Sequence, residues 1–414
     1  MLPIFLSALV GLTSAPLATA ATEKPLFYIL EEDGKTPVSA GDGHARNAFG
    51  GSKDTPEQRS LRDKELASKF YNKDGSGLVT PGSSSARTQA ITPAECIPMD
   101  TGEPNFKHRD RFTSCRTMTF GIGYPDEKAL EFDVTVAYTA AADGSQSVRA
   151  EFYVYDGRVI GDPPADWYDT QVGIQVLCSA INSTSCSGPG ALIKPMNQWI
   201  AQEYLFTHVV STSGTTTARD GKALYEVGHA FYDPISGTWP VLDRTDLFRC
   251  DTATYLGLPA GCVFTARTFS LNVQFARDRY PDVVDHIRDA QYNPAATKPG
   301  HFTLIPGNPK NGTPLTRLYP GYDKAFYDRN HAKAVQTCIE FWGTGYTEGG
   351  TKDCDEYPFR STYQGAAYSD NGGSVGYSAR PLAKGQNRSA GSDLGIFYKD
   401  QRLLDGDGFF VNSI

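Results

Sequence analysis

Two adjacent carboxylates, Asp355 and Glu356, are the side chains of this chain best placed to do chemistry. They follow Cys354 and precede Tyr357 and Pro358. Because proline fixes its own φ and steers the preceding residue away from helix, we expect the two acids on a stiff, extended segment. Such a segment can hold a metal ion or a water molecule with little positional freedom. The alternative is a solvated surface turn, which the same residue types also form.

Two further stretches occur in a fixed order with this segment. Residues 279–281 read Arg-Tyr-Pro, residues 286–290 read His-Ile-Arg-Asp-Ala, and residues 387–392 read Asn-Arg-Ser-Ala-Gly-Ser. Together with residues 354–359, these stretches resemble signature segments of the NucA/NucB-type secreted deoxyribonucleases. The resemblance does not cover the part of the chain before residue 279.

The resemblance implies a metal-dependent enzyme that hydrolyses DNA with little sequence preference. Oxygen ligands suit Mg²⁺ or Mn²⁺, and Glu356 and the amide oxygen of Asn387 are of this type. Asp355 would then accept the proton from the attacking water. Adjacent residues of an extended segment point to opposite faces, so the sequence leaves open which of the two acids reaches the site.

Three other residues receive roles from the same resemblance. His286 would be a catalytic base or phosphate donor, and Arg288 and Arg388 would bind the substrate phosphate. The residues themselves also allow other interpretations. His286 can pair with Asp282 one helical turn earlier, each arginine can be a solvated surface charge, and Asn387 can be a plain helix N-cap.

Two positions depart from the family pattern. Gln364, with Tyr363 before it, stands where many members carry acidic residues, and Ile396 stands where one branch has asparagine. We expect these changes to affect the choice of metal or the rate.

The first twenty residues and the cysteines indicate export. Residues 1–20 contain an apolar run and end Ala-Thr-Ala, which is typical of a secretory signal peptide, and no later apolar run is long enough for a membrane anchor. A secreted, extracellular protein is therefore expected. The eight cysteines form four close pairs in sequence, which predict four local disulfides rather than a zinc site: Cys96–Cys115, Cys178–Cys186, Cys250–Cys262 and Cys338–Cys354.

The composition along the chain predicts an α+β protein with two folded parts. After the signal peptide, residues 21–91 are a low-complexity or pro-like segment and linker, with one candidate helix at 56–70. Residues 92–269 contain alternating and β-branched runs, which predict an antiparallel β-sandwich-like domain of unknown role. The runs with the clearest strand pattern are 129–136, 148–155, 205–210 and 223–227.

Residues 270–414 are predicted to form a small mixed α/β nuclease domain. Helices are expected at 281–290, at 329–335 and from about 388 to 404, the last with Asn387 as its N-cap, followed by a strand at 409–411. Strand, loop and helix around a metal would resemble the ββα-metal nucleases, by fold analogy.

The net charge of −8 at pH 7 neither supports nor excludes a DNA substrate. An alternative function is a secreted β-rich protein that binds carbohydrate or a cell surface and carries an inactive nuclease-like domain. A serine hydrolase has little support, because the sequence has no Gly-x-Ser-x-Gly motif.

Overall fold

The structure is a computed structural model. It describes residues 27–30, 91–99, 106–125, 127–181, 185–213, 218–233, 238–265, 272–300, 304–371 and 375–413. The predicted signal peptide and the candidate helix at 56–70 lie outside the described residues.

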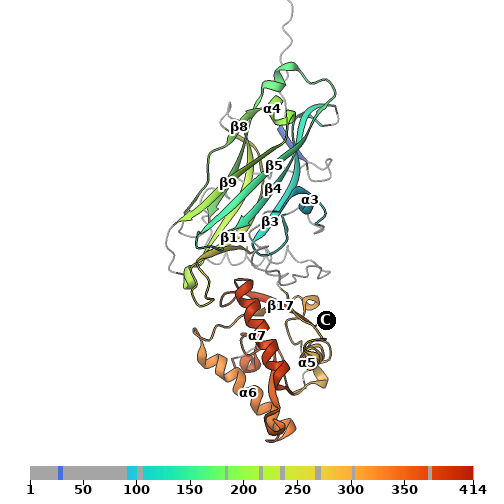
Figure 1. Cartoon of the computed structure of the whole chain (residues 1–414), viewed down its shortest axis with the longest axis vertical. Coiled ribbons are helices and arrows are strands. Elements are labelled where there is room, and N and C mark those ends of the chain that lie inside the picture. The colour runs from blue at the N-terminus through green and yellow to red at the C-terminus, as the bar shows by residue number, and fades with distance from the viewer. Residues whose placement is uncertain are drawn as a thin grey trace, which may run out of the picture.

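The protein is a mixed α+β structure, as the sequence predicts. A large antiparallel, curled β-structure forms the N-terminal part, and a C-terminal part contains helices and small sheets. Figure 1 shows the large β-structure in the upper half of the molecule. The helices α5 (Pro281–Tyr292), α6 (Lys324–Trp342) and α7 (Lys384–Asp400) and the strand β17 (Gly408–Ser413) are in the lower half.

The N-terminal part, here called the β-rich region, contains two sheets. The seven-stranded sheet has the order β1-β3-β4-β5-β9-β7, with β2 paired to β3, and the five-stranded sheet has the order β12-β11-β10-β6-β8. The strands of the first sheet are β1 (Phe27–Leu30), β2 (Lys107–His108), β3 (Thr113–Tyr124), β4 (Lys128–Ala140), β5 (Ser147–Ile160), β7 (Ser185–Ser187) and β9 (Tyr204–Ser213). Those of the second sheet are β6 (Gln171–Ala180), β8 (Leu192–Pro195), β10 (Ala223–Asp233), β11 (Thr238–Asp251) and β12 (Gly261–Phe264). The short helices of this region are α3 (Pro93–Cys96), η2 (Ala165–Asp169), α4 (Met196–Ala201) and η3 (Arg219–Gly221).

An aromatic core joins the two sheets. Phe120 of the first sheet stacks on Phe231 of the second with ring centroids 4.1 Å apart. The four strands with the clearest sequence pattern are all confirmed, because their apolar residues alternate into this core. Strand β1 was not predicted. It lies inside the segment expected to be pro-like, and its buried Ile29 and Leu30 explain its pairing with β3.

The C-terminal region, residues 272–413, combines three long helices with two small sheets. In the first sheet, β17 lies between β13, which is parallel to it, and β14, which is antiparallel; the second is a ribbon of β15 and β16. The elements in chain order are β13 (Asn272–Phe275), α5 (Pro281–Tyr292), η5 (Pro294–Ala296), η6 (Pro309–Asn311), β14 (Leu315–Thr316), α6 (Lys324–Trp342), η7 (Glu348–Gly350), β15 (Lys352–Tyr357), η8 (Ala366–Asn371), β16 (Ser378–Ala383), α7 (Lys384–Asp400) and β17 (Gly408–Ser413).

The predicted helices agree with the structure to different degrees. Helix α5 begins at Pro281 as expected, and the predicted terminal strand is β17. Helix α6 is longer than predicted, because Asp323 caps it by accepting a hydrogen bond from the Phe326 amide at 2.8 Å. The prediction that Asn387 caps the last helix is wrong. Strand β16 continues directly into α7, whose N-cap is Ala383, so Asn387 lies within the helix near its start.

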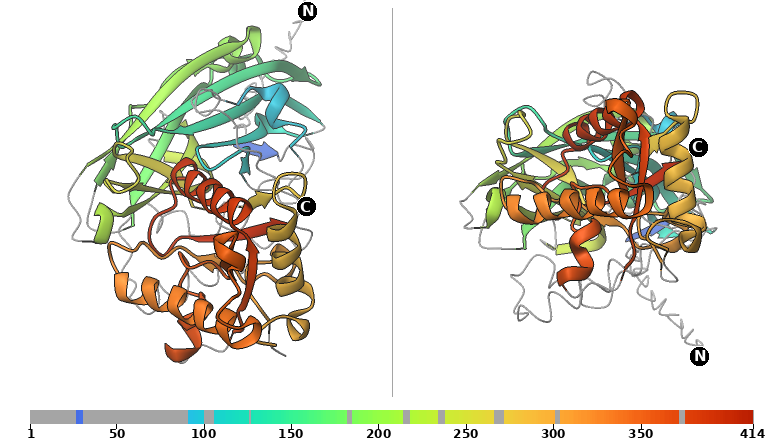
Figure 2. Two further views of the ribbon diagram at one scale, coloured as in Figure 1. Left: turned by 60° about the horizontal axis from the view of Figure 1, so that its bottom comes forward. Right: turned by 90° about the horizontal axis from the view of Figure 1, so that it is seen from below.

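Helices cover both faces of the β15–β16 ribbon. Tyr357 and Leu382 pack with apolar residues of α5 and α7 on one face, and Cys354 and Ala379 pack with α6 on the other. Figure 2 shows the helices from two further directions. This arrangement positions the acid pair, because side chains of β15 alternate between the two covered faces.

All four disulfides join the cysteine pairs predicted from spacing. Four disulfides fit an extracellular protein. Within the described part of the chain, no helix combines the length and the hydrophobicity needed to cross a membrane.

Candidate active site

Strand β15 sends Asp355 and Glu356 to opposite faces of the ribbon. In the antiparallel register with β16, Asp355 is opposite Arg380 and Glu356 is opposite Ala379. The strand is fixed at its end by Tyr357, which is fully buried and whose hydroxyl accepts a hydrogen bond from Gln291 Nε2 at 2.8 Å. The two acids therefore have different neighbours.

Asp355 is held by the histidine of helix α5. His286 Nδ1 lies 2.6 Å from Asp355 Oδ2, and His286 Nε2 lies 2.7 Å from Ser378 Oγ. The imidazole is completely buried, whereas Asp355 keeps 8% of its surface exposed. In the tautomer that carries its proton on Nδ1, the imidazole donates to Asp355 and Nε2 accepts from the serine hydroxyl. Both ring nitrogens are therefore occupied.

This geometry corrects the interpretations of His286 made from the sequence. The histidine does not pair with Asp282, which instead exchanges hydrogen bonds with Gln386 at 2.9 and 3.1 Å. A fully buried imidazole with both nitrogens occupied also has no free position for a water or a phosphate. His286 is suited to orient Asp355, as a positioning residue.

Glu356 lies in surroundings that disfavour its ionised form. It is partly buried on the α6 face, and burial together with the charge of Asp355 raises its pKa to about 8. The positive charge of Arg360 opposes this rise. The protonated form of Glu356 is therefore favoured near neutral pH.

Arg360 is a candidate that the sequence analysis missed. Its guanidinium lies 4.0 Å above the Tyr327 ring, donates to Asp328 Oδ1 at 2.7 Å and is about one-third exposed (31%). His331, which lies on α6 like Tyr327 and Asp328, is a neighbour of Arg360. Burial together with the charge of Arg360 lowers the pKa of this histidine. The only sequence signal for Arg360 is its position four residues after Glu356, beyond the proline that ends the strand.

The start of α7 lies against the same strand. Arg388 Nε donates to Asp353 Oδ2 at 2.9 Å, and the Arg388 side chain remains 66% exposed. Asn387 precedes it in the same helical turn, is partly exposed and makes no side-chain hydrogen bond to the described residues. Arg388 and Asn387 are therefore both beside β15, with polar atoms that a substrate or an ion can reach.

Arg288 is not brought to this site in the way the motif suggested. It lies two residues after the buried His286 on α5, which turns its side chain about 200° away around the helix axis. Its side chain is exposed and forms no ion pair with the described residues. Arg288 is therefore not beside the buried imidazole of His286.

Of the two departures from the family pattern, Gln364 has a clear structural role. Its Oε1 accepts hydrogen bonds from the backbone amide and the hydroxyl of Thr316, at 2.8 and 3.1 Å. Ile396 lies on α7 with 53% of its surface exposed.

Glu356 and Asn387 offer oxygen ligands, the type that a hard cation prefers. Within the described residues, no group of three or more His, Cys, Asp and Glu side chains is arranged to hold a metal. Magnesium usually keeps several waters and needs only one or two carboxylates from the protein. Burial and the charge of Asp355 favour the protonated form of Glu356, and a divalent cation bound there would favour the ionised form instead.

Comparison with known proteins gives one family match, in the C-terminal part of the chain. Residues 311–412 match the family model described as Deoxyribonuclease NucA/NucB. No curated protein and no solved structure matches the chain. The matched range contains Asp355, Glu356, Asn387 and Arg388, whereas the motif around His286 lies before it. The resemblance drawn from the motifs is thus confirmed, and the C-terminal part of this chain contains a NucA/NucB deoxyribonuclease domain.

Proposed function

We propose that the protein is an exported, metal-dependent endonuclease that hydrolyses DNA with little sequence preference. The observation that carries the proposal is the buried His286–Asp355 pair, at 2.6 Å. Its Asp355 lies within residues 311–412, the range that matches the NucA/NucB deoxyribonucleases, and His286 lies before that range. This pair orients a carboxylate that is still reachable from solvent. An oriented carboxylate is what the removal of a proton from an attacking water needs.

In this proposal Asp355 is the general base. It accepts one proton from the water whose oxygen attacks phosphorus, and the phosphorus–oxygen bond to the leaving sugar oxygen breaks with its electron pair. His286 keeps the Asp355 carboxylate in place through the whole step. It does not touch the substrate, because both of its nitrogens are bonded within the protein.

Positive side chains around β15 would hold the phosphodiester. Arg360 and Arg388 are both partly exposed and lie next to the acid strand. Each can donate to phosphate oxygens in the planar, two-pronged geometry of a guanidinium. Arg288 remains a candidate for contacts farther along the DNA, since its charge is exposed.

Glu356, on the α6 face of the ribbon, would hold the divalent cation, Mg²⁺ or Mn²⁺. Asn387, the second ligand expected from the sequence, lies at the start of α7, which packs on the other face. A bound cation would supply charge neutralisation at the phosphate and stabilise the leaving oxygen. The order of elements supports this assignment, because β15, β16 and α7 are two antiparallel strands followed directly by a helix. This order resembles a ββα-metal motif, and the fold analogy is part of the proposal.

We further propose that the catalytic domain extends from about residue 270 to residue 414. Strand β13 pairs with β17 at the end of the chain, and α5 contributes His286. Both elements precede the range that matches the family model.

A plasmid-cleavage assay on the purified, oxidised protein tests this function. The proposal predicts nicking or linearisation with Mg²⁺ or Mn²⁺ and none with a chelator. Absence of cleavage with every metal would contradict it and would favour a carbohydrate- or surface-binding protein with an inactive nuclease-like domain. A glycan-binding assay would then follow.

A further inference from the structure

The turn between α7 and β17 is buried although it is a connecting loop. Residues 401–407, here called the junction turn, contain Arg402, Leu403 and Leu404, each with 0% of its surface exposed. Loops usually run over the surface, because their backbone polar groups need water or another partner. Here the partner is the β-rich region, on which this turn lies.

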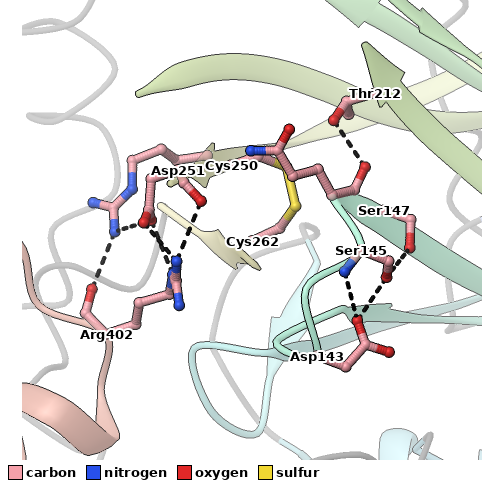
Figure 3. The surroundings of a disulfide bond; sticks show 10 residues. Asp143, Ser145, Ser147, Thr212, Cys250, Asp251, Cys262 and Arg402 are labelled. Carbon is pink, nitrogen blue, oxygen red and sulfur yellow. Dashed lines mark hydrogen bonds and ion pairs between the residues drawn. A yellow bond between two sulfur atoms is a disulfide. The ribbon is translucent and has the colours of Figure 1, made fainter. Parts of the chain in front are cut away.

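One buried ion pair joins Arg402 to the end of strand β11. Its guanidinium donates to the two carboxylate oxygens of Asp251 at 2.6 and 3.0 Å and to the carbonyl of Pro259 at 2.7 Å. Both side chains of the pair are completely buried. Figure 3 shows Arg402 reaching Asp251 beside the disulfide of Cys250 and Cys262.

A second charged cluster is centred on Asp407. Arg249 Nη1 lies 2.7 Å and Arg111 Nη2 lies 3.0 Å from its carboxylate, and both arginines come from the β-rich region. Arg111 also donates to the Gln401 carbonyl at 2.8 Å. Without Asp407, the buried Arg249 and Arg111 would lose a carboxylate that compensates their charge, and an uncompensated buried charge is destabilising. The C-terminal region therefore completes the charge balance of the β-rich region.

Aromatic and apolar contacts extend the same interface. Tyr255 of the β-rich region stacks on Tyr319 at 3.8 Å, and its hydroxyl accepts from the Asp405 amide at 2.9 Å. Arg219 lies 4.5 Å above the Tyr322 ring. Leu404 packs in a small apolar cluster with two residues of the β-rich region, Ala253 and Leu256.

The conformation of the junction turn depends on these contacts. Arg402 has φ of 45°, in the left-handed region that non-glycine residues seldom adopt. Such a conformation persists when the surroundings fix it, and here the fully buried guanidinium does so. The turn follows directly after α7, the helix that carries Asn387 and Arg388 at its other end. A shift of the turn would therefore tilt the helix at the candidate active site.

We propose that the β-rich region is a permanent brace of the nuclease domain, docked on the junction turn, and not a binding module that works independently. The brace holds the end of α7 and so fixes the position of its start against β15. The structural part of this proposal does not depend on enzymatic activity. Only the effect on DNA cleavage rests on the proposed function.

The first test separates the two regions covalently within the full chain. Residues 266–271, between β12 and β13, are replaced by the recognition sequence of a site-specific protease. No disulfide crosses this position, since all eight cysteines pair within one side or the other. After cleavage at neutral pH, the brace predicts that both halves elute together from a size-exclusion column. Separate elution of two folded halves would overturn it.

Matched variants then test which contacts hold the halves together. Asp251→Asn removes the charge that faces Arg402, and we expect association after cleavage to weaken on the order of a hundredfold. Asp285→Asn is the control, because Asp285 pairs with Arg277 on the exposed side of α5. Equal association of both variants and the wild type would contradict the assigned interface.

A third variant covers the case in which Asp251→Asn does not fold. The Arg219 side chain is 60% exposed, so Arg219→Ala should leave each half folded while removing its contacts with Tyr322 and Asp405. We expect weaker association of these cleaved halves than of the wild type, and unchanged association would contradict the proposal. Co-elution without any DNA cleavage by the intact protein would refute the enzyme function and leave the brace standing.

Discussion

Replacing His286 with alanine tests the buried pair that orients the proposed base. The substitution removes the hydrogen bond to Asp355 at 2.6 Å and the one to Ser378 at 2.7 Å. A hydrogen bond to a charged group contributes about 1.5–3 kcal/mol, and one between neutral groups about 0.5–1.5 kcal/mol. Their sum, about 2–4.5 kcal/mol, is the expected loss in the free energy of unfolding from these bonds alone.

The same substitution should lower the rate of DNA cleavage more than it weakens DNA binding. His286 is fully buried and acts through Asp355, so its loss lets the carboxylate move without removing a contact to DNA. Loss of such a positioning bond typically reduces activity about 10- to 100-fold. We therefore expect a lower kcat with nearly unchanged KM.

The assay combines urea unfolding with plasmid-cleavage kinetics on the same samples. Asp285→Asn is the control on the same helix, because the Asp285 side chain is 42% exposed and pairs with the exposed Arg277. A surface change of this kind usually alters stability by less than about 0.5 kcal/mol. His286→Gln can still donate to Asp355 and should recover part of the rate.

Two results would refute this reasoning. The first is a His286→Ala protein with the stability and the rate of the wild type, which would mean that the pair does no positioning. The second is a rise in KM with unchanged kcat, which would mean that the histidine contacts DNA directly.

Three further predictions concern the charges and the disulfide around the site. Basic neighbours keep the pKa of Asp407 below its unfolded value of about 3.9. The ionised Asp407 therefore contributes its full stabilisation above about pH 3.9, and this stabilisation is lost as the pH falls toward the pKa of the folded state. Urea midpoints should therefore drop below about pH 4 in the wild type and less steeply in Asp407→Asn; equal slopes would contradict this. Removing the Cys338–Cys354 disulfide, whose ends are 16 residues apart, should lower the free energy of unfolding in urea by about 3 kcal/mol. Unchanged stability would contradict this and would mean that α6 holds β15 without the disulfide. Arg360→Ala should weaken DNA binding and reduce the slope of log K for DNA binding against log salt concentration by about 1. An unchanged slope would exclude a contact between Arg360 and a phosphate.

The elements governed by local pattern were predicted well from the sequence. Strands such as β5 alternate between core and outside, and this period of two is visible in the residues themselves. Cysteine spacing gave the correct pairs because each disulfide closes a short loop. Helix α5 could be predicted from Pro281 at its first position and its apolar face.

Features that depend on contacts between distant segments could not be predicted. The partner of His286 lies 69 residues away on another element, so local helical spacing suggested Asp282 instead. Arg360 belongs to no motif that the sequence analysis used, and its role follows only from its position beside Glu356. The same holds for Arg402 and Asp251, which are 151 residues apart and meet only because the two regions dock.

The start of α7 shows a different kind of error. Asparagine is a favoured N-cap, and this preference pointed to Asn387. In the structure β16 leads straight into the helix at Lys384, and the helix begins without a side-chain cap. Tertiary packing of the ribbon thus overrides a local preference.

The central claim is that the acid pair of β15 hydrolyses DNA. Its most direct test compares supercoiled plasmid cleavage by the wild type, Asp355→Asn, Glu356→Gln and the double variant, with Asp285→Asn as control, all with Mg²⁺ and with Mn²⁺. The account predicts metal-dependent cleavage by the wild type and the control, and at least a hundredfold slower cleavage, on the order of a lost general base, by each acid variant. Full activity of the double variant, at wild-type stability, would contradict it.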